Sequence, residues 1–230
     1  MKTLRFFLII ITSLITFSSI NAQQQALYSQ YMFNGLVINP AYAGSNEAAS
    51  ISLLSRKQWV GMEGAPLTHT FSAHTPLKNE QVGVGFNVMH DQIGVTSQTT
   101  VNGAYAYRIP IGKGKLAMGL QATFTNYSAE LSSLSMKNQD DPVFQSNDMQ
   151  SFSPNFGTGL YYYNDKFYAG ISIPQILTLD YTGRKDISIA KQARHYFFNA
   201  GYLMTLNHHF KLKPNVLITA VEGAPINYDL

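Results

Sequence analysis

The chain has no cysteine among its 230 residues. It therefore forms no disulfide, carries no lipid on an N-terminal cysteine, and builds no zinc or iron–sulfur site from thiolates. We expect strand pairing and side-chain burial to supply all of its stability.

Charged residues are also scarce, at 13% of the chain, about half of the quarter that is usual in soluble domains. Lys2 and Arg5 are two of the 16 basic residues, which leaves 14 against 13 acidic ones in the rest of the chain. This near balance argues against a nucleic-acid partner and against a polybasic patch for membrane surfaces.

The sequence has one long apolar stretch, from Phe6 to Phe17, preceded by Lys2 and Arg5 and followed by Ile20-Asn21-Ala22. This layout predicts a secretory signal peptide over residues 1–22, with cleavage after Ala22. A retained N-terminal anchor is the alternative, but a membrane span needs roughly 20 apolar residues. No later segment reaches 18 consecutive apolar residues, so we expect no membrane-spanning helix.

Alternating apolar residues recur between Gln81 and Ala220. Val82, Val84 and Phe86, for example, alternate with Gly83 and Gly85. The same pattern occupies residues 116–125, 166–173 and 210–220. Side chains alternate across a strand, so each run predicts a strand with one apolar face and one polar, small-residue face.

A membrane protein without apolar helices has to close its sheet, because lipid offers no partner for a free backbone edge. Lys166, Lys211 and Lys213 all fall in the polar register, whereas a charge on the lipid face at mid-depth costs about 2–4 kcal/mol. The sequence therefore predicts an all-β fold: a transmembrane antiparallel up-and-down β-barrel of the bacterial outer membrane. A secreted β-sandwich is the alternative, although glycine-rich faces would pack it poorly.

The predicted strands are joined by connections that are alternately short and long. They cover residues 48–56, 66–75, 82–90, 96–109, 115–127, 154–163, 166–174, 194–206, 210–221 and 226–230. Short connections fall on one side and the long segments 128–153 and 175–191 on the other, as with periplasmic turns and external loops. Since the tenth strand has only begun at Leu230, we expect the barrel, residues 48–230, to be truncated at its C-terminus.

Residues 23–47 have no strand-length alternation and are rich in polar and aromatic side chains. We predict that they fold into the periplasmic mouth or form a plug, and a flexible linker is the open alternative. The candidate plug or partner-binding residues are Tyr28, Tyr31, Met32, Phe33, Asn39 and Pro40.

Glu-Gly-Ala-Pro occurs twice, at Glu63–Pro66 and Glu222–Pro225, each time in a predicted external connection. The repeat is either a turn motif used twice or a paired substrate-binding rim. The candidate rim residues are Trp59, Glu63, Gly64, Pro66, Glu222, Gly223 and Pro225. At the other end, five aromatic residues surround the predicted Asn164-Asp165 turn and suggest an interfacial girdle: Tyr161, Tyr162, Tyr163, Phe167 and Tyr168.

Several segments of the sequence resemble the PorP/SprF family, outer-membrane proteins of the type IX secretion and gliding-motility systems of Bacteroidetes. The resemblance rests on residues 28–35, 38–44, 56–59, 63–66, 153–157 and 164–170 and covers nearly all of the mature chain. It implies a barrel that helps to deliver or retain type IX substrates at the cell surface. The implied partners are a large secreted surface protein, periplasmic peptidoglycan-binding and ring or motor components, and outer-membrane lipid. Family members continue through further strands.

The resemblance implies no catalytic residue, and the residues themselves suggest no catalytic, cofactor-binding or metal site. His90-Asp91 has no serine nucleophile at a matching spacing, which leaves a Ser–His hydrolase as the weakest hypothesis. A passive or substrate-specific porin stays open, because small polar inner faces would leave a lumen. An adhesin that displays segments 128–153 and 175–191 is a third alternative.

Overall fold

The computed structural model describes residues 31–78, 80–130, 149–178, 193–207, 210–222 and 224–230. The predicted signal peptide, Tyr28, Gly223 and most of the two predicted external loops therefore lie outside the described residues.

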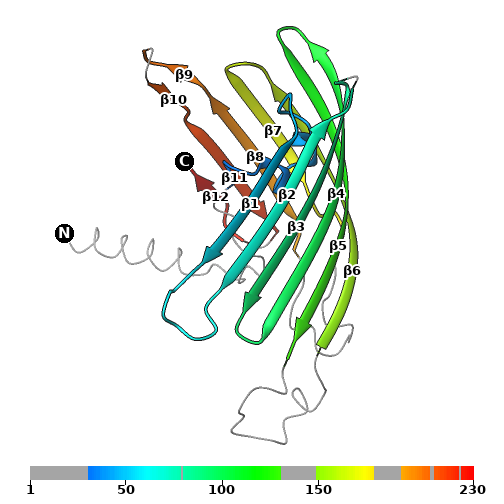
Figure 1. Ribbon diagram of the computed structural model, residues 1–230, viewed down its shortest axis with the longest axis vertical. Helices are drawn as coiled ribbons and strands as arrows, with labels where there is room; N and C mark the ends of the chain where they lie inside the picture. The colour runs from blue at the N-terminus through cyan, green and yellow to red at the C-terminus, as the bar shows by residue number, and fades with distance from the viewer. Residues whose placement is uncertain (1–30, 79, 131–148, 179–192, 208–209, 223) are drawn as a thin grey trace, which may run out of the picture.

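Ten of the described strands form one antiparallel, up-and-down sheet in the order β1-β2-β3-β4-β5-β6-β7-β8-β11-β12 (Figure 1). Its strands are β1 (Ser50–Lys57), β2 (Leu67–Pro76), β3 (Val82–Ile93), β4 (Thr96–Ile111), β5 (Gly114–Ala129), β6 (Met149–Tyr163), β7 (Phe167–Ile173), β8 (His195–Tyr202), β11 (Asn215–Val221) and β12 (Asn227–Asp229). The predicted all-β, antiparallel fold is confirmed. In the described part of the chain, no helix is long and apolar enough to cross a membrane.

Two of the predicted strands are interrupted. β8 is followed by the short β9 (Met204–Thr205), and β10 (Lys211–Leu212) precedes β11, so that β9 and β10 pair as a separate two-stranded ribbon. Pro214 lies between β10 and β11 and has no N–H to donate to a strand ladder, which explains the break there.

Two connections are tighter than predicted. Only Gly94-Val95 separates β3 from β4, and only Gly112-Lys113 separates β4 from β5. Both glycines adopt positive φ angles, 57° and 60°. Two-residue turns with positive φ match the right-handed twist of the flanking strands, so the strands continue in pairs up to the turn.

Burial across the sheet is the reverse of that in a soluble protein. On β5 the inward-facing Gln121 and Thr123 are 6% and 0% exposed, whereas the outward-facing Leu120 and Phe124 are 63% and 48% exposed. The outer face therefore presents apolar side chains and the inner face polar ones, as predicted. Lipid is the medium that suits such an outer face, and a β-sandwich core is excluded.

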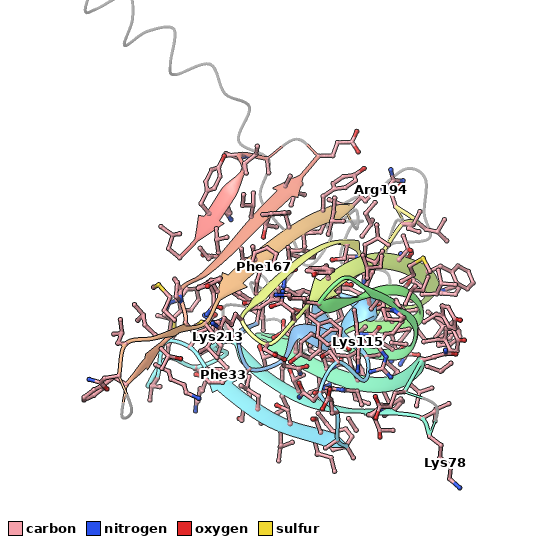
Figure 2. All side chains as sticks on the ribbon, turned by 90° about the horizontal axis from the view of Figure 1, so that it is seen from above. Phe33, Lys78, Lys115, Phe167, Arg194 and Lys213 are labelled. Atoms are coloured by element: carbon pink, nitrogen blue, oxygen red, sulfur yellow. The ribbon has the colours of Figure 1, made fainter. Side chains whose placement is uncertain are left out.

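The sheet curls around residues 31–47, seen from above in Figure 2. Among the described strands, β1 and β12 each have a single neighbour, and they form the two edges of the sheet.

A charge on this outer face provides a test of the membrane assignment. We expect Leu120→Arg to lower the free energy of unfolding in phospholipid vesicles by about 2–4 kcal/mol, because the guanidinium replaces a mid-strand, lipid-facing leucine. Asn126→Arg, on the same face of β5 but near the end of the strand, is the matched control and costs about 0–1 kcal/mol. Equal, small effects of both variants would contradict a lipid-covered face.

Candidate functional site

The described residues 31–47, here called the inner segment, lie across the inner face of the sheet (Figure 1, blue). The inner segment contains two single-turn 3-10 helices, η1 (Gly35–Val37) and η2 (Pro40–Tyr42). Asn39 caps η2, because its side-chain Oδ1 accepts a hydrogen bond of 2.9 Å from the Ala41 N–H. Pro40 at the first helical position has no N–H that needs a partner.

The inner segment lies on three glycines of the sheet, Gly83, Gly119 and Gly159, here called the glycine floor. A Cβ atom on Gly83 of β3 would stand 2.1 Å from the Ala43 carbonyl oxygen, and one on Gly119 of β5 would stand 2.1 Å from the Ala41 nitrogen. A Cβ on Gly159 of β6 would be 2.2 Å from Asn39 Oδ1. These small inner residues suggested a lumen from the sequence, and the inner segment occupies the space beside them.

Polar side chains of the sheet hold the backbone of the inner segment. The Ser172 hydroxyl donates to the Ile38 carbonyl oxygen at 2.6 Å, and the Gly44 N–H donates to His74 Nδ1 at 3.1 Å. Arg108, only 3% exposed, donates to the carbonyl oxygens of Gly44 and Val82. Recognition is therefore mostly of main-chain groups.

Asn39 adds a contact over a long sequence separation. Its Nδ2 donates to the Leu160 carbonyl oxygen at 3.0 Å, 121 positions further along the chain. Asn39 is 1% exposed, so the loss of this side chain would leave buried polar groups without partners.

Small apolar clusters complete the packing of the inner segment. Leu36 and Ala43 pack against Ala104 and Ala106 of β4. A second cluster joins Tyr31 and Ile38 to Leu217 of β11, and a third joins Ala41 to Ala117 and Tyr161. The inner segment thus contacts both halves of the sheet.

The predicted aromatic girdle is corrected by the structure. Tyr161 is 5% exposed and faces inward, where its ring lies 5.5 Å from Tyr42 and 5.8 Å from Tyr168. Tyr162 and Phe167 point outward, with ring centroids 6.4 Å apart. The reason is the strand period of two, which sends alternate tyrosines to opposite faces. Burial raises the pKa of the Tyr42 phenol.

A second stretch, residues 174–177, also lies on the inner face. Gln121 Nε2 donates to the Pro174 carbonyl oxygen at 2.8 Å, and Asn155 Nδ2 donates to the Leu177 carbonyl oxygen at 2.8 Å. A Cβ on Gly157 would stand 2.2 Å from the Pro174 carbonyl oxygen. This corrects the prediction that the external loop begins at residue 175. The two stretches are neighbours along the strands, because Gly119 and Gln121 are successive inner positions of β5, roughly 7 Å apart.

The structure separates the candidate plug residues. Tyr31, Asn39 and Pro40 are buried in the inner segment. Met32 and Phe33 are 52% and 74% exposed, and Met32 Sδ accepts a hydrogen bond of 3.4 Å from Asn215 Nδ2, so a plug or partner-binding role for these two stays a prediction. Leu36, Ile38 and Ala41 are the buried apolar anchors. The sequence carries only a weak signal for them, since they have no strand or helix periodicity.

The candidate rim residues lie at one end of the sheet but at its opposite edges. Trp59, Glu63 and Gly64 are exposed in the β1–β2 connection, where Pro66 is buried. Glu222 and Pro225 are exposed in the β11–β12 connection. A paired rim built from both connections stays a prediction.

At the opposite end of the sheet, Lys115 forms an ion pair with Glu47, the last residue of the inner segment. Its Nζ lies 3.6 Å from Glu47 and 3.3 Å from Glu80 (Figure 2). Within the described ranges, no three His, Cys, Asp or Glu side chains gather in a way that could hold a metal ion.

Comparison with known proteins identifies a family. Residues 20–230 match the family described as "Type IX secretion system membrane protein PorP/SprF". No curated protein and no solved structure matches the chain. The match covers almost the whole sequence and agrees with a sheet whose outer face is apolar, so the chain belongs to the PorP/SprF family of type IX secretion system membrane proteins.

Proposed function

We propose that this protein is a non-enzymatic accessory barrel of the outer membrane. It supports secretion, surface attachment or gliding-adhesin delivery by the type IX secretion system, with a lumen plugged by residues 23–47. Membership of the family supports the type IX assignment. The proposed partners are a large surface protein outside the cell, and peptidoglycan-binding and ring or motor components in the periplasm.

The observation that carries the proposal is the fit between the inner segment and its glycine floor. Gly83, Gly119 and Gly159 come from three different strands, and at each position a Cβ would overlap the inner segment. A flexible linker would not need such a floor. The fit favours an adaptor with a filled interior over a passive pore.

The lengths of the connections support the orientation that we propose. The β2–β3, β4–β5 and β6–β7 connections are short, and they share an end with the inner segment's entry into β1. The longer β5–β6 and β7–β8 connections lie at the other end. Outer-membrane barrels usually have short periplasmic turns and long external loops, which supports an orientation with the inner segment on the periplasmic side and the surface protein on the side of the long connections.

A porin is the alternative, because the inner wall also carries polar side chains such as Thr100 and Thr125. Conductance separates the two functions. We expect the purified mature protein in liposomes to conduct no ions, and a variant that lacks residues 24–42 to conduct.

The same deletion tests the function in cells. We expect it to abolish surface display of the cognate secreted protein, whereas a linker would tolerate the loss. Circular dichroism checks that the variant keeps its strand content. Conductance by the intact protein, together with normal display after the deletion, would support the porin and overturn the proposal.

A further inference from the structure

The β1–β2 connection carries a group of exposed apolar side chains, here called the apolar tip, Trp59–Met62. Trp59, Val60 and Met62 are 67%, 81% and 62% exposed. Trp59 is the only tryptophan of the chain. Three large apolar side chains within four residues of one loop are unusual on a surface that only water covers.

The apolar tip has a defined conformation. The Gln58 N–H donates to the Pro66 carbonyl oxygen at 2.9 Å and closes the connection at its base. The Met62 N–H donates to the Trp59 carbonyl oxygen at 3.1 Å, and the Gly94 N–H of the neighbouring turn donates to the Gly64 carbonyl oxygen at 2.8 Å. Neighbouring backbone therefore supports the loop on both sides.

Trp59 itself has a φ angle of 46°, in the left-handed region that bulky residues avoid. Strain of this kind persists where the surrounding structure imposes it, and it concentrates at functional sites. The strained residue here is also the largest exposed side chain of the loop. The geometry thus presents the indole outward.

Two cross-strand rows of outward-facing residues separate the apolar tip from the apolar part of the outer face, here called the lipid-facing belt. The belt on β1 and β2 ends at the paired Leu53 and Phe71. The next outward row consists of Ser55, His69 and His90, and the row after that of Lys57, Leu67 and Gln92. Five of these six side chains are polar.

The spacing of these rows places the apolar tip beyond the lipid. Two rows correspond to roughly 13 Å along the strands, or about 10 Å along the membrane normal for strands tilted by about 40°, whereas the headgroup region of one leaflet is only about 5–7 Å thick. The apolar tip lies at the same end of the sheet as the long β5–β6 and β7–β8 connections. This is the external end in the proposed orientation.

We infer that the apolar tip is the docking point for the surface protein, which offers an apolar pocket to the Trp59 indole. This inference rests on the proposed function and names the contact through which the barrel would retain its partner. Tryptophan is enriched in interface hot spots, and an apolar core with a polar rim, here Lys57 and Glu63, is the usual layout of an interface.

The single tryptophan makes the position of the tip measurable. In vesicles of the mature protein, we expect iodide in the buffer to quench the fluorescence of Trp59, and lipids brominated on their acyl chains to leave it unchanged. Quenching by the brominated chains would place the indole in the membrane and overturn the inference in favour of a lipid anchor.

A crosslinking experiment identifies the occupant. The probe is the surface protein that disappears from the cell surface when the gene for this barrel is deleted. A photo-crosslinking amino acid in place of Val60 should capture that protein, and the same amino acid in place of Leu53, 80% exposed on the belt of the same edge strand, should not. Absence of the Val60 crosslink, or an equal yield from both positions, would overturn the inference.

Retention in cells completes the test. We expect the triple variant Trp59→Ser, Val60→Ser, Met62→Ser to retain about tenfold less of the surface protein, or still less, and to release it into the medium. Heat-modifiable migration on gels verifies that the barrel is folded. Normal retention by the triple variant, when gene deletion abolishes it, overturns the docking site alone; normal retention after gene deletion overturns the proposed function itself.

Discussion

Gly119→Val is expected to displace the inner segment from the sheet. A Cβ at this position would stand 2.1 Å from the Ala41 nitrogen and 2.5 Å from its Cα. These are backbone atoms, so the clash is relieved only if the inner segment moves. Overpacking of this kind costs about 1–3 kcal/mol, which raises the undocked population roughly 5- to 150-fold. Conductance of liposomes and proteolysis of residues 31–47 in the folded protein measure that population.

Gly103→Val is the matched control. Gly103 lies on β4 and is exposed on the outer face, and nothing lies within 4 Å of a Cβ built there. The same substitution at this position should leave conductance and proteolysis unchanged. If Gly119→Val and Gly103→Val behave alike, the inner segment is not docked on the glycine floor in the membrane.

Arg108→Met is expected to release the end of the inner segment that leads into β1. The Arg108 guanidinium donates to the carbonyl oxygens of Gly44 and Val82. In the variant the Val82 oxygen keeps the Leu77 N–H as a donor at 2.8 Å, whereas the Gly44 oxygen loses the guanidinium. An unsatisfied buried acceptor costs about 1–3 kcal/mol. Removal of a buried charge offsets part of this cost in the whole protein, so the local effect should exceed the global one.

Hydrogen exchange separates the two effects of Arg108→Met. We expect exchange of the Gly44 amide, which is bonded to His74, to accelerate about ten- to a hundred-fold, while the global unfolding free energy changes less. Arg108→Lys keeps the charge with a single donor group and should give an intermediate rate. An unchanged Gly44 amide in Arg108→Met would show that His74 and the glycine floor suffice to hold this end.

The faces of the sheet could be predicted residue by residue. Val84 and Phe86 were expected on one face and Gly83 on the other; Val84 and Phe86 are 36% and 45% exposed on the outer face, and Gly83 is buried on the inner face. The reason is that the strand period of two is a local property, so each residue's face follows from its neighbours along the chain. The same period was misjudged only for the tyrosine group, where the expected girdle ignored that Tyr161 and Tyr162 point in opposite directions.

The sequence predicted the order of the connections between strands correctly, but it predicted their lengths less well. The pairs Gly94-Val95 and Gly112-Lys113 turned out to be complete turns, because a positive-φ glycine allows the paired strands to continue to within two residues of each other. Pro214 in turn interrupted a strand that the apolar pattern alone would have continued.

The path of the inner segment and of residues 174–177 came only from the tertiary structure. Nothing local to Asn39 specifies Leu160 as the partner of its amide, and nothing local to Gln121 specifies Pro174. Small residues such as Gly119 predict space on the inner face, but not its occupant, since a lumen and a packed segment require the same absence of a side chain. Alternation along the strands thus determined an antiparallel sheet with an apolar outer face. Contacts between residues far apart in the chain decided what fills its interior, because such contacts form only once the sheet has curled.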